Sequence, residues 1–260
     1  MRNILLTISY DGTDFCGWQR QDSSDNGNSV RTVQGEIEKS LEKLHKQKVN
    51  LSGSGRTDSG VHAFAQAANF FSPIDSIPEE KFTVALNSFL PPDIRIMESR
   101  AVPNDFSARF SATSRTYRYF FHTGNPFASQ MRFVWPIHRR PDVEILNEMS
   151  SFLQGELDCA AFSASGDQSI STCRYIEDAH FYYDEKNPEI LIFEITANAF
   201  LWRMVRSLAG TFIFFEKSGR TPKYFKQVLD SKDRSKAGPT APPTGLFLYK
   251  ISFDGIRRHV

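Results

Sequence analysis

The chain has 260 residues, of which 40% are apolar and 23% are charged, and its formal net charge is +1. This balance, with 23 phenylalanines, excludes a disordered or fibrous protein, and three widely spaced cysteines exclude a disulfide framework and a CxxC zinc site. No apolar run approaches the ~18 residues of a membrane span, and the N-terminus lacks the pattern of a signal peptide, so we expect a cytoplasmic protein with no membrane contact.

The first 105 residues predict the order strand, helix, strand, strand, helix, strand. Apolar side chains alternate from Asn3 to Tyr10, as in a strand, and recur at helical spacing from Val33 to Leu44. Ser76 and Glu79 have the spacing of a capping box and predict a helix that reaches Phe89. The other predicted strands cover residues 49–52, 64–71 and 94–101.

The second half of the chain predicts a similar order. Strands are expected over 116–122, 173–182, 189–197 and 246–253, with helices over 145–153 and 201–215 and a short extra helix from Thr221-Pro222. Two α+β units of one β-α-β-β-α-β order predict a duplicated, tandem ferredoxin-like protein with antiparallel or mixed sheets. We place the N-terminal domain at residues 1–105 and the C-terminal domain at 106–260, with the active-site cleft between them.

The small net charge hides two basic stretches. Residues 100–140 carry a net charge of +6 and residues 217–236 carry +5, so the rest of the chain carries −10. This segregation favours binding to a polyanion. Two solvated basic faces would give the same pattern.

The densest chemical signal is the stretch GSGRTDSGVHA, residues 53–63. Its glycines allow a ligand to approach the backbone closely. Residues two apart in an extended loop project to the same side, so Arg56 and Asp58 can face one cleft. A tight surface turn with Asp58 as a cap would also fit. A phosphate loop lacks its GxxxxGK[ST] motif, and His62 is the only other metal ligand nearby.

The string GRTDSGVHA closely resembles the active-site loop of the TruA-type tRNA pseudouridine synthases. Four further motifs, in the order of that family, extend the resemblance along nearly the whole chain. They are YDGTDFCGWQ (10–19), TVQGEI (32–37), FSARFSA with RTYRY (106–112 and 115–119), and FLWRMVR with APPTGL (200–206 and 241–246). The chain departs from the family where Leu157-Asp158-Cys159 replaces His-Asp-Phe and where Arg115 replaces Lys.

The resemblance implies an isomerase that converts uridine to pseudouridine in tRNA, at about positions 38 to 40 of the anticodon stem-loop. It implies a homodimer that uses no cofactor and no metal. Asp58 would be the catalytic carboxylate, whether it attacks C1′, attacks C6 or removes a sugar proton. Arg206 would hold that carboxylate ionised, and Tyr117 would stack on the base and relay a proton. Arg56 would fill the gap that the extruded uridine leaves in the stem or hold the displaced phosphate, and Leu246 would line the uracil pocket.

Two other function classes remain open from the residues themselves. A non-catalytic RNA-binding protein of ferredoxin-like fold would need no catalytic Asp58, although the aromatic RNA-binding string of such modules is absent. A hydrolytic glycosidase would need a second carboxylate about 5 to 9.5 Å from the first. The next acid after Asp58 is Asp75.

Overall fold

The computed structural model describes residues 1–21 and 30–258 as a mixed α+β protein. The chain forms two compact units. Unit 1 contains Met1–Thr113 and Phe247–Gly255, and unit 2 contains Ser114–Leu246 and the C-terminal residues from Ile256. The first unit therefore extends eight residues beyond the boundary drawn after residue 105, and it also takes most of the last strand.

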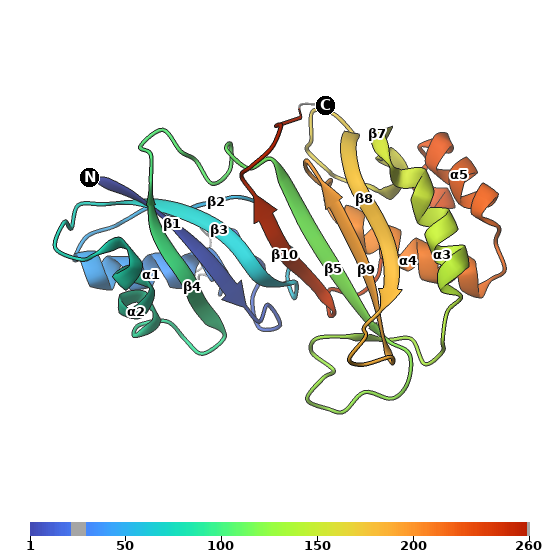
Figure 1. The fold of residues 1–260 in the computed structure, drawn as a ribbon, viewed down its shortest axis with the longest axis horizontal. Helices are drawn as coiled ribbons and strands as arrows, with labels where there is room; N and C mark the ends of the chain where they lie inside the picture. The colour runs from blue at the N-terminus through green and yellow to red at the C-terminus, as the bar shows by residue number, and fades with distance from the viewer. Residues whose placement is uncertain (22–29, 259–260) are drawn as a thin grey trace. The chain divides into compact units, whose positions relative to one another are not determined.

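Unit 1 has the order of elements that the sequence predicts. Three antiparallel strands lie in the order β4-β1-β3, and β10 adds in parallel to β3 (Figure 1). The elements are β1 (Arg2–Tyr10), α1 (Val33–His45), β2 (Ser52–Gly53), β3 (His62–Ser72), a 3₁₀ turn (Glu79–Lys81), α2 (Phe82–Asn87), β4 (Ile94–Val102) and β10 (Leu246–Ser252).

The second helix of unit 1 begins later than predicted, and the capping box at Ser76 is wrong. Pro78 is extended and makes no side-chain cap, and a 3₁₀ turn precedes α2. The hydroxyl of Ser99 on β4 accepts a hydrogen bond from the Thr83 amide at 3.0 Å. A residue 16 positions away thus satisfies an amide that a local cap would otherwise have satisfied.

An aromatic cluster joins α1 and α2 to the sheet of unit 1. The imidazole of His45 stacks on Phe82, contacts the edge of Phe70, and lies 3.0 Å from the Ser72 hydroxyl. All four side chains are buried. The two helices are therefore fixed on one face of the sheet, and β1 and β3 are held beneath them.

Unit 2 contains a sheet of order β5-β9-β8-β7, antiparallel throughout, with β6 parallel to β5. The two-residue β6 and the four-residue β7 are too short to show a periodicity and were not predicted. The elements are β5 (Ser114–His122), β6 (Trp135–Pro136), α3 (Val143–Ser150), β7 (Gly155–Asp158), β8 (Cys173–Tyr183), β9 (Ile190–Ala197), α4 (Met204–Lys217) and α5 (Pro222–Ser231), with 3₁₀ turns at Ser151–Leu153, Ala160–Phe162 and Arg234–Lys236.

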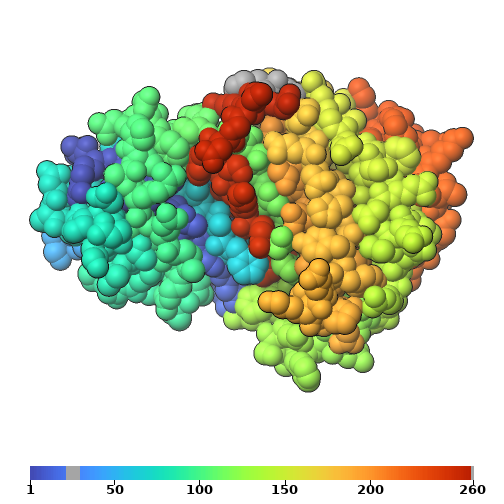
Figure 2. All heavy atoms as spheres, viewed as in Figure 1, coloured from blue at the N-terminus to red at the C-terminus, as the bar shows by residue number. Residues whose placement is uncertain are grey.

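Phenylalanine rings form the core of unit 2. Phe181 on β8 stacks on Phe193 of β9, and both meet Phe212 of α4 edge to face. Phe212 then stacks on Phe225 of α5, at 4.7 Å between ring centroids. The helices thus cover one face of this sheet, and Figure 2 shows β8 uncovered on the other. Within the described residues, no helix combines the length and apolar character needed to cross a membrane.

Candidate active site

The loop that carries Arg56 and Asp58 links β2 to β3 in unit 1. Its residues 56–58 are neither helix nor strand, and burial alternates along them: Arg56 is exposed, Thr57 is buried and Asp58 is half-buried. The Thr57 hydroxyl lies 2.8 Å from the Tyr10 hydroxyl inside the unit. This alternation is that of an extended segment whose middle residue points inward.

The segment after β1 holds this loop through backbone groups. The Trp18 amide donates to the Thr57 carbonyl at 3.2 Å, and the Gly60 amide donates to the Phe15 carbonyl at 3.4 Å. Gly17 has φ +90°, and a Cβ there would lie 2.7 Å from the Thr57 oxygen. Only glycine fits this close approach. Gly17 and Trp18 of the motif YDGTDFCGWQ therefore shape the loop that carries Asp58.

His62 is a core residue at the start of β3. Its side chain is fully buried, and its Nδ1 lies 3.0 Å from the Gly12 amide and 3.2 Å from Asp11 Oδ1. Phe247 stacks on the ring at 4.6 Å. Within residues 1–21 and 30–258, no group of three or more histidine, cysteine or acidic side chains is arranged to hold a metal ion.

Tyr117 and Tyr119 stand on β5 in unit 2 and have different surroundings. Tyr117 is half-buried, and its ring meets Phe200 edge to face at 5.0 Å. Tyr119 is fully buried and donates a 2.6 Å hydrogen bond to the Pro242 carbonyl. Burial raises the pKa of Tyr119 well above its ordinary value, although the charge of Arg206 opposes the shift. Tyr119 is therefore a permanent donor at neutral pH.

Arg206 lies in the first turn of α4 and binds the segment that leads to Leu246. Its Nε donates to the Ala241 carbonyl at 2.9 Å, and the Ala241 amide donates back to the Arg206 carbonyl at 3.0 Å. Leu246 is 4% exposed. Before it, Gly245 has φ +86°, and a Cβ there would lie 2.6 Å from the Phe120 oxygen. Arg206 and Tyr119 thus secure the APPTGL segment from two sides.

The sequence analysis missed these supporting residues. Tyr10 and Tyr119 occupy inward positions of apolar strands, where a tyrosine is usually a core residue, and their hydroxyl partners are far away in sequence. The signal that could have identified them is the position of each tyrosine beside a motif: Tyr10 opens YDGTDFCGWQ, and Tyr119 ends RTYRY.

The atypical segment 157–159 has a structural role. Asp158 accepts hydrogen bonds from the Thr172 hydroxyl at 2.6 Å and the Ala160 amide at 3.1 Å, and it pairs with Lys232 at 2.9 Å. The Thr172 hydrogen bond is the main cause that lowers the pKa of Asp158. Burial raises the pKa of the Cys159 thiol to about 12. The thiol is therefore a neutral packing group at physiological pH.

Many of the bases in the two basic stretches are engaged within the protein. In the stretch 217–236, Lys226 pairs with Asp230, Lys232 pairs with Asp158, and Arg234 donates to the Gly238 carbonyl. In the stretch 100–140, the same holds for Arg115, Arg118, Arg139 and Arg140, which bond to Asn198, Glu194, Glu216 and Pro188 respectively. The ion pairs of Arg118, Arg139 and Lys232 with acids outside the two stretches therefore lower the charge available to a polyanion, whereas bases bonded to carbonyls keep their charge.

Arg56 and Asp58 thus lie together in unit 1, whereas Tyr117, Arg206 and Leu246 lie in unit 2. Each of these five side chains belongs to a segment that hydrogen bonds or packing within its own unit hold in place. The groups offer a carboxylate, guanidinium groups, an aromatic ring with a hydroxyl, and an apolar wall.

Comparison with known proteins gives consistent matches. A family model described as tRNA pseudouridine synthase matches residues 6–111 and 149–254. The chain is 56% identical to tRNA pseudouridine synthase A of Treponema denticola, over 97% of this chain and 93% of the relative. It is 50% identical to the Treponema pallidum protein of that name (92% and 84%) and 39% identical to that of Caldicellulosiruptor bescii (97% and 100%).

Proposed function

This chain belongs to the tRNA pseudouridine synthase family, and on that premise we propose that it isomerises uridines at positions 38 to 40 of the tRNA anticodon stem-loop. The reaction itself, conversion of uridine to pseudouridine in tRNA, follows from the family. The observation that carries it is the 56% identity over 97% of the chain. The position in the tRNA rests on the motif resemblance.

The reaction requires a reactive group at the sugar or base and a means of turning the base. The N1–C1′ bond breaks, the uracil turns, a C5–C1′ bond forms, C5 loses its proton and N1 gains one. We assign the reactive group to Asp58, because a carboxylate can act there as nucleophile or base. The support from the structure is local: Asp58 is half-buried on an extended loop that backbone hydrogen bonds hold in place.

The other roles follow the family's motifs. Arg206 would favour the ionised form of Asp58 and fix its orientation. Tyr117 would stack on the uracil and relay the proton between C5 and N1. The exposed Arg56 would occupy the space that the extruded uridine leaves in the stem, and Leu246 would form the apolar wall of the pocket. No cofactor enters this scheme, because no electrons and no group are transferred.

The architecture and assembly complete the proposal. Two tandem ferredoxin-like units would provide one active site with residues from both, and the family model's match in each half of the chain supports the duplication. A homodimer in the cytoplasm would bind tRNA by shape more than by sequence. Sedimentation of the purified protein would test the dimer.

Incubation with unmodified tRNA transcripts tests the function. Pseudouridine is mapped by carbodiimide-dependent stops of reverse transcription, with Asp58→Asn as a control of nearly unchanged shape. Stops at positions 38 to 40 that Asp58→Asn lacks would support the proposal, and stops elsewhere would refute the assigned positions. Binding without stops would favour a non-catalytic RNA-binding protein, and release of free uracil would show hydrolysis.

A further inference from the structure

Trp202 differs from the other tryptophans in being at the surface. Its side chain is 44% exposed, whereas Trp18 is 2% exposed and Trp135 is partly buried. The guanidinium of Arg203 lies over the indole, 4.6 Å from the ring centroid. A large flat ring with a cation on it lies at the surface just before α4.

The backbone at this point departs from the usual start of a helix. An N-cap residue ordinarily has an extended backbone and a short polar side chain that caps the first turn. Arg203 is the N-cap of α4, yet its φ is +58° and its side chain makes no cap. Left-handed conformations are uncommon for residues other than glycine. The fold therefore maintains an unfavourable local conformation that leaves the guanidinium over the neighbouring indole.

A second loop fixes the backbone of Trp202. Asp167 accepts hydrogen bonds from the Trp202 amide and, at 2.7 Å, from the Ser169 amide, and the Ala164 amide donates to the Trp202 carbonyl at 3.0 Å. Partial burial opposes ionisation of Asp167, but the hydrogen bonds from Ser169 and Trp202 lower its pKa below the ordinary value. Both carboxylate oxygens are used inside the loop, and the backbone that carries the ring is held rigidly.

Trp202 lies in the same segment of the chain as residues that contact or supply the groups assigned to the reaction. Phe200, two positions before Trp202, packs against Tyr117 at 5.0 Å. Arg206 follows Trp202 by four residues and lies in the first turn of α4, which begins at Met204. All four residues belong to unit 2. An RNA held at Tyr117 and Arg206 would therefore pass along the 200–206 segment, whose exposed ring is the Trp202 indole.

We infer that Trp202 and Arg203 form a stacking platform for a nucleobase that flanks the target uridine in the bound tRNA. This inference rests on the proposed function and extends it. Exposed aromatic rings bind unstacked bases of RNA, and each such stack contributes substantially to affinity whatever the base. The Arg203 guanidinium adds a cation that can stack on the same base or contact its phosphate. The platform holds the strand beside the extruded uridine and takes no part in bond making.

Steady-state kinetics with an unmodified tRNA transcript test the platform. Trp202→Ala is expected to raise KM for tRNA about tenfold, the loss of one base–aromatic stack, with little change in kcat. Trp202→Phe retains a ring and is expected to raise KM less than threefold. Arg203→Asn removes the cation and introduces a residue that tolerates the left-handed backbone. The KM of this variant for tRNA is expected to rise severalfold.

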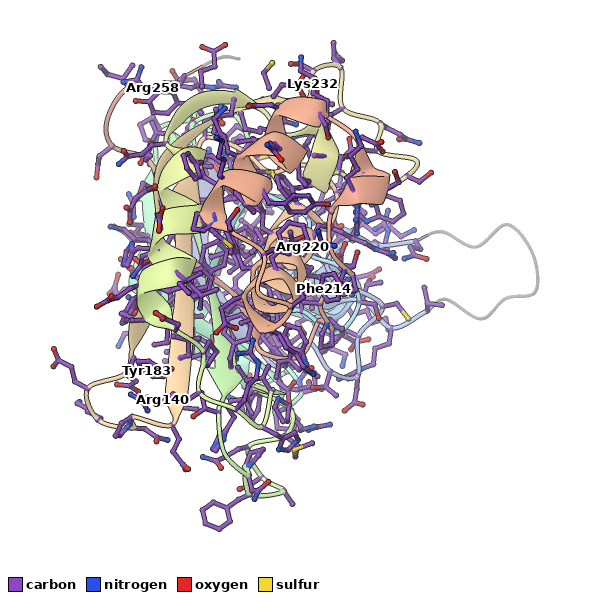
Figure 3. All side chains as sticks on the ribbon, turned by 90° about the vertical axis from the view of Figure 1, so that its right-hand side faces the viewer. Arg140, Tyr183, Phe214, Arg220, Lys232 and Arg258 are labelled. Carbon is purple, nitrogen blue, oxygen red and sulfur yellow. The ribbon has the colours of Figure 1, made fainter. Side chains whose placement is uncertain are left out.

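Phe214→Ala is the matched control. Phe214 is 47% exposed and lies in the last turn of α4, the helix that begins after Trp202 and Arg203 (Figure 3). Its replacement removes a similar exposed ring and is expected to leave KM unchanged. An equal rise of KM in Phe214→Ala would mean that exposed apolar area on α4, and not this platform, binds the tRNA.

Two further measurements separate stacking from a structural effect. Acrylamide quenching of tryptophan fluorescence, in an Asp58→Asn background that prevents turnover, should fall when tRNA binds, and this protection should be absent when Trp202→Phe is added. A transcript with an abasic site at a flanking nucleotide should abolish the KM difference between wild type and Trp202→Ala. The platform would be overturned if the KM difference persists whichever flank carries the abasic site, or if Trp202→Ala leaves KM unchanged. Absence of pseudouridine with the wild-type protein would instead refute the proposed function.

Discussion

The loop 53–62 of unit 1 and the segment 198–206 of unit 2 are both held by backbone and side-chain hydrogen bonds, but the segment depends on the side chain of a residue assigned to the reaction, Arg206. In the loop, the Ser54 and Gly60 amides donate to the Ala67 and Phe15 carbonyls, and the Thr57 carbonyl accepts from the Trp18 amide. In the segment, Asn198 accepts hydrogen bonds from the Tyr175 and Ala199 amides, and Arg206 donates its own. In the loop, the side-chain supports are Thr57 and Ser59, whereas in the segment an exchange at Arg206 removes a support together with the proposed catalytic group.

The largest expected effect is that of Asp58→Ala, which should abolish pseudouridine formation and leave Tm within about 2 °C of wild type. The residue is half-buried on a loop that backbone hydrogen bonds hold, so its loss removes little packing. Carbodiimide mapping and thermal unfolding measure the two quantities. Glu98→Ala, at an exposed acid on β4 of the same unit, serves as the control that keeps activity. A large loss of stability in Asp58→Ala would show that the carboxylate caps the turn.

Arg206→Ala should lower both activity and stability, and this distinguishes it from Asp58→Ala. Loss of the Nε hydrogen bond to Ala241 should cost about 2 kcal/mol, because the donor is charged and its partner segment is mostly buried. For a chain of this size that is a fall in Tm of about 4–8 °C. Arg206→Lys should restore little activity, because an ammonium lacks the planar fork. Full rescue by lysine would show that charge alone is required.

Tyr119→Phe should have an intermediate effect that tests how far unit 2 depends on side-chain support. It removes the donor to the Pro242 carbonyl and leaves that oxygen without its partner, at a cost of about 1–2 kcal/mol. The segment before Leu246 should loosen, and KM for tRNA should rise severalfold. Tyr183→Phe is matched, because it removes a hydroxyl that donates to the Pro141 carbonyl. Equal activity loss in both variants would contradict a specific role for Tyr119.

The smallest effects concern two lysines of α5, which differ in their surroundings. Lys226 pairs with Asp230, whereas Lys223 makes no ion pair within the described residues. If α5 contacts the tRNA backbone, Lys223→Ala should flatten the slope of log affinity against log salt by about 0.7–0.9. Lys226→Ala should change the slope less. Binding titrations at several salt concentrations measure both, and equal slopes in wild type and both variants would exclude this helix from the RNA contact.

Regular elements with strong periodicity were predicted well from the sequence. The strand at Arg2–Tyr10, the helix at Val33–His45 and the Thr221 cap of α5 all occur where the pattern places them. Each depends on residues within one or two turns of one another, which a single sequence displays directly. The predictions failed where a distant partner decides, as at α2, whose first turn Ser99 completes.

The sequence by itself determined the α+β class, the order of the main elements and the family. Apolar periodicity and the five ordered motifs each involve residues that are near one another in the sequence, so they can be recognised without the structure. Only the tertiary structure decided that the last strand pairs with β3 at His62 and Ala63, that Tyr119 and Arg206 share the 241–242 segment, and that Arg203 is left-handed with its guanidinium over an exposed indole. Each of these depends on which strand edges, carbonyls and rings meet after folding. The periodicity of a sequence describes which residues are buried, but it does not specify which distant residue each of them meets.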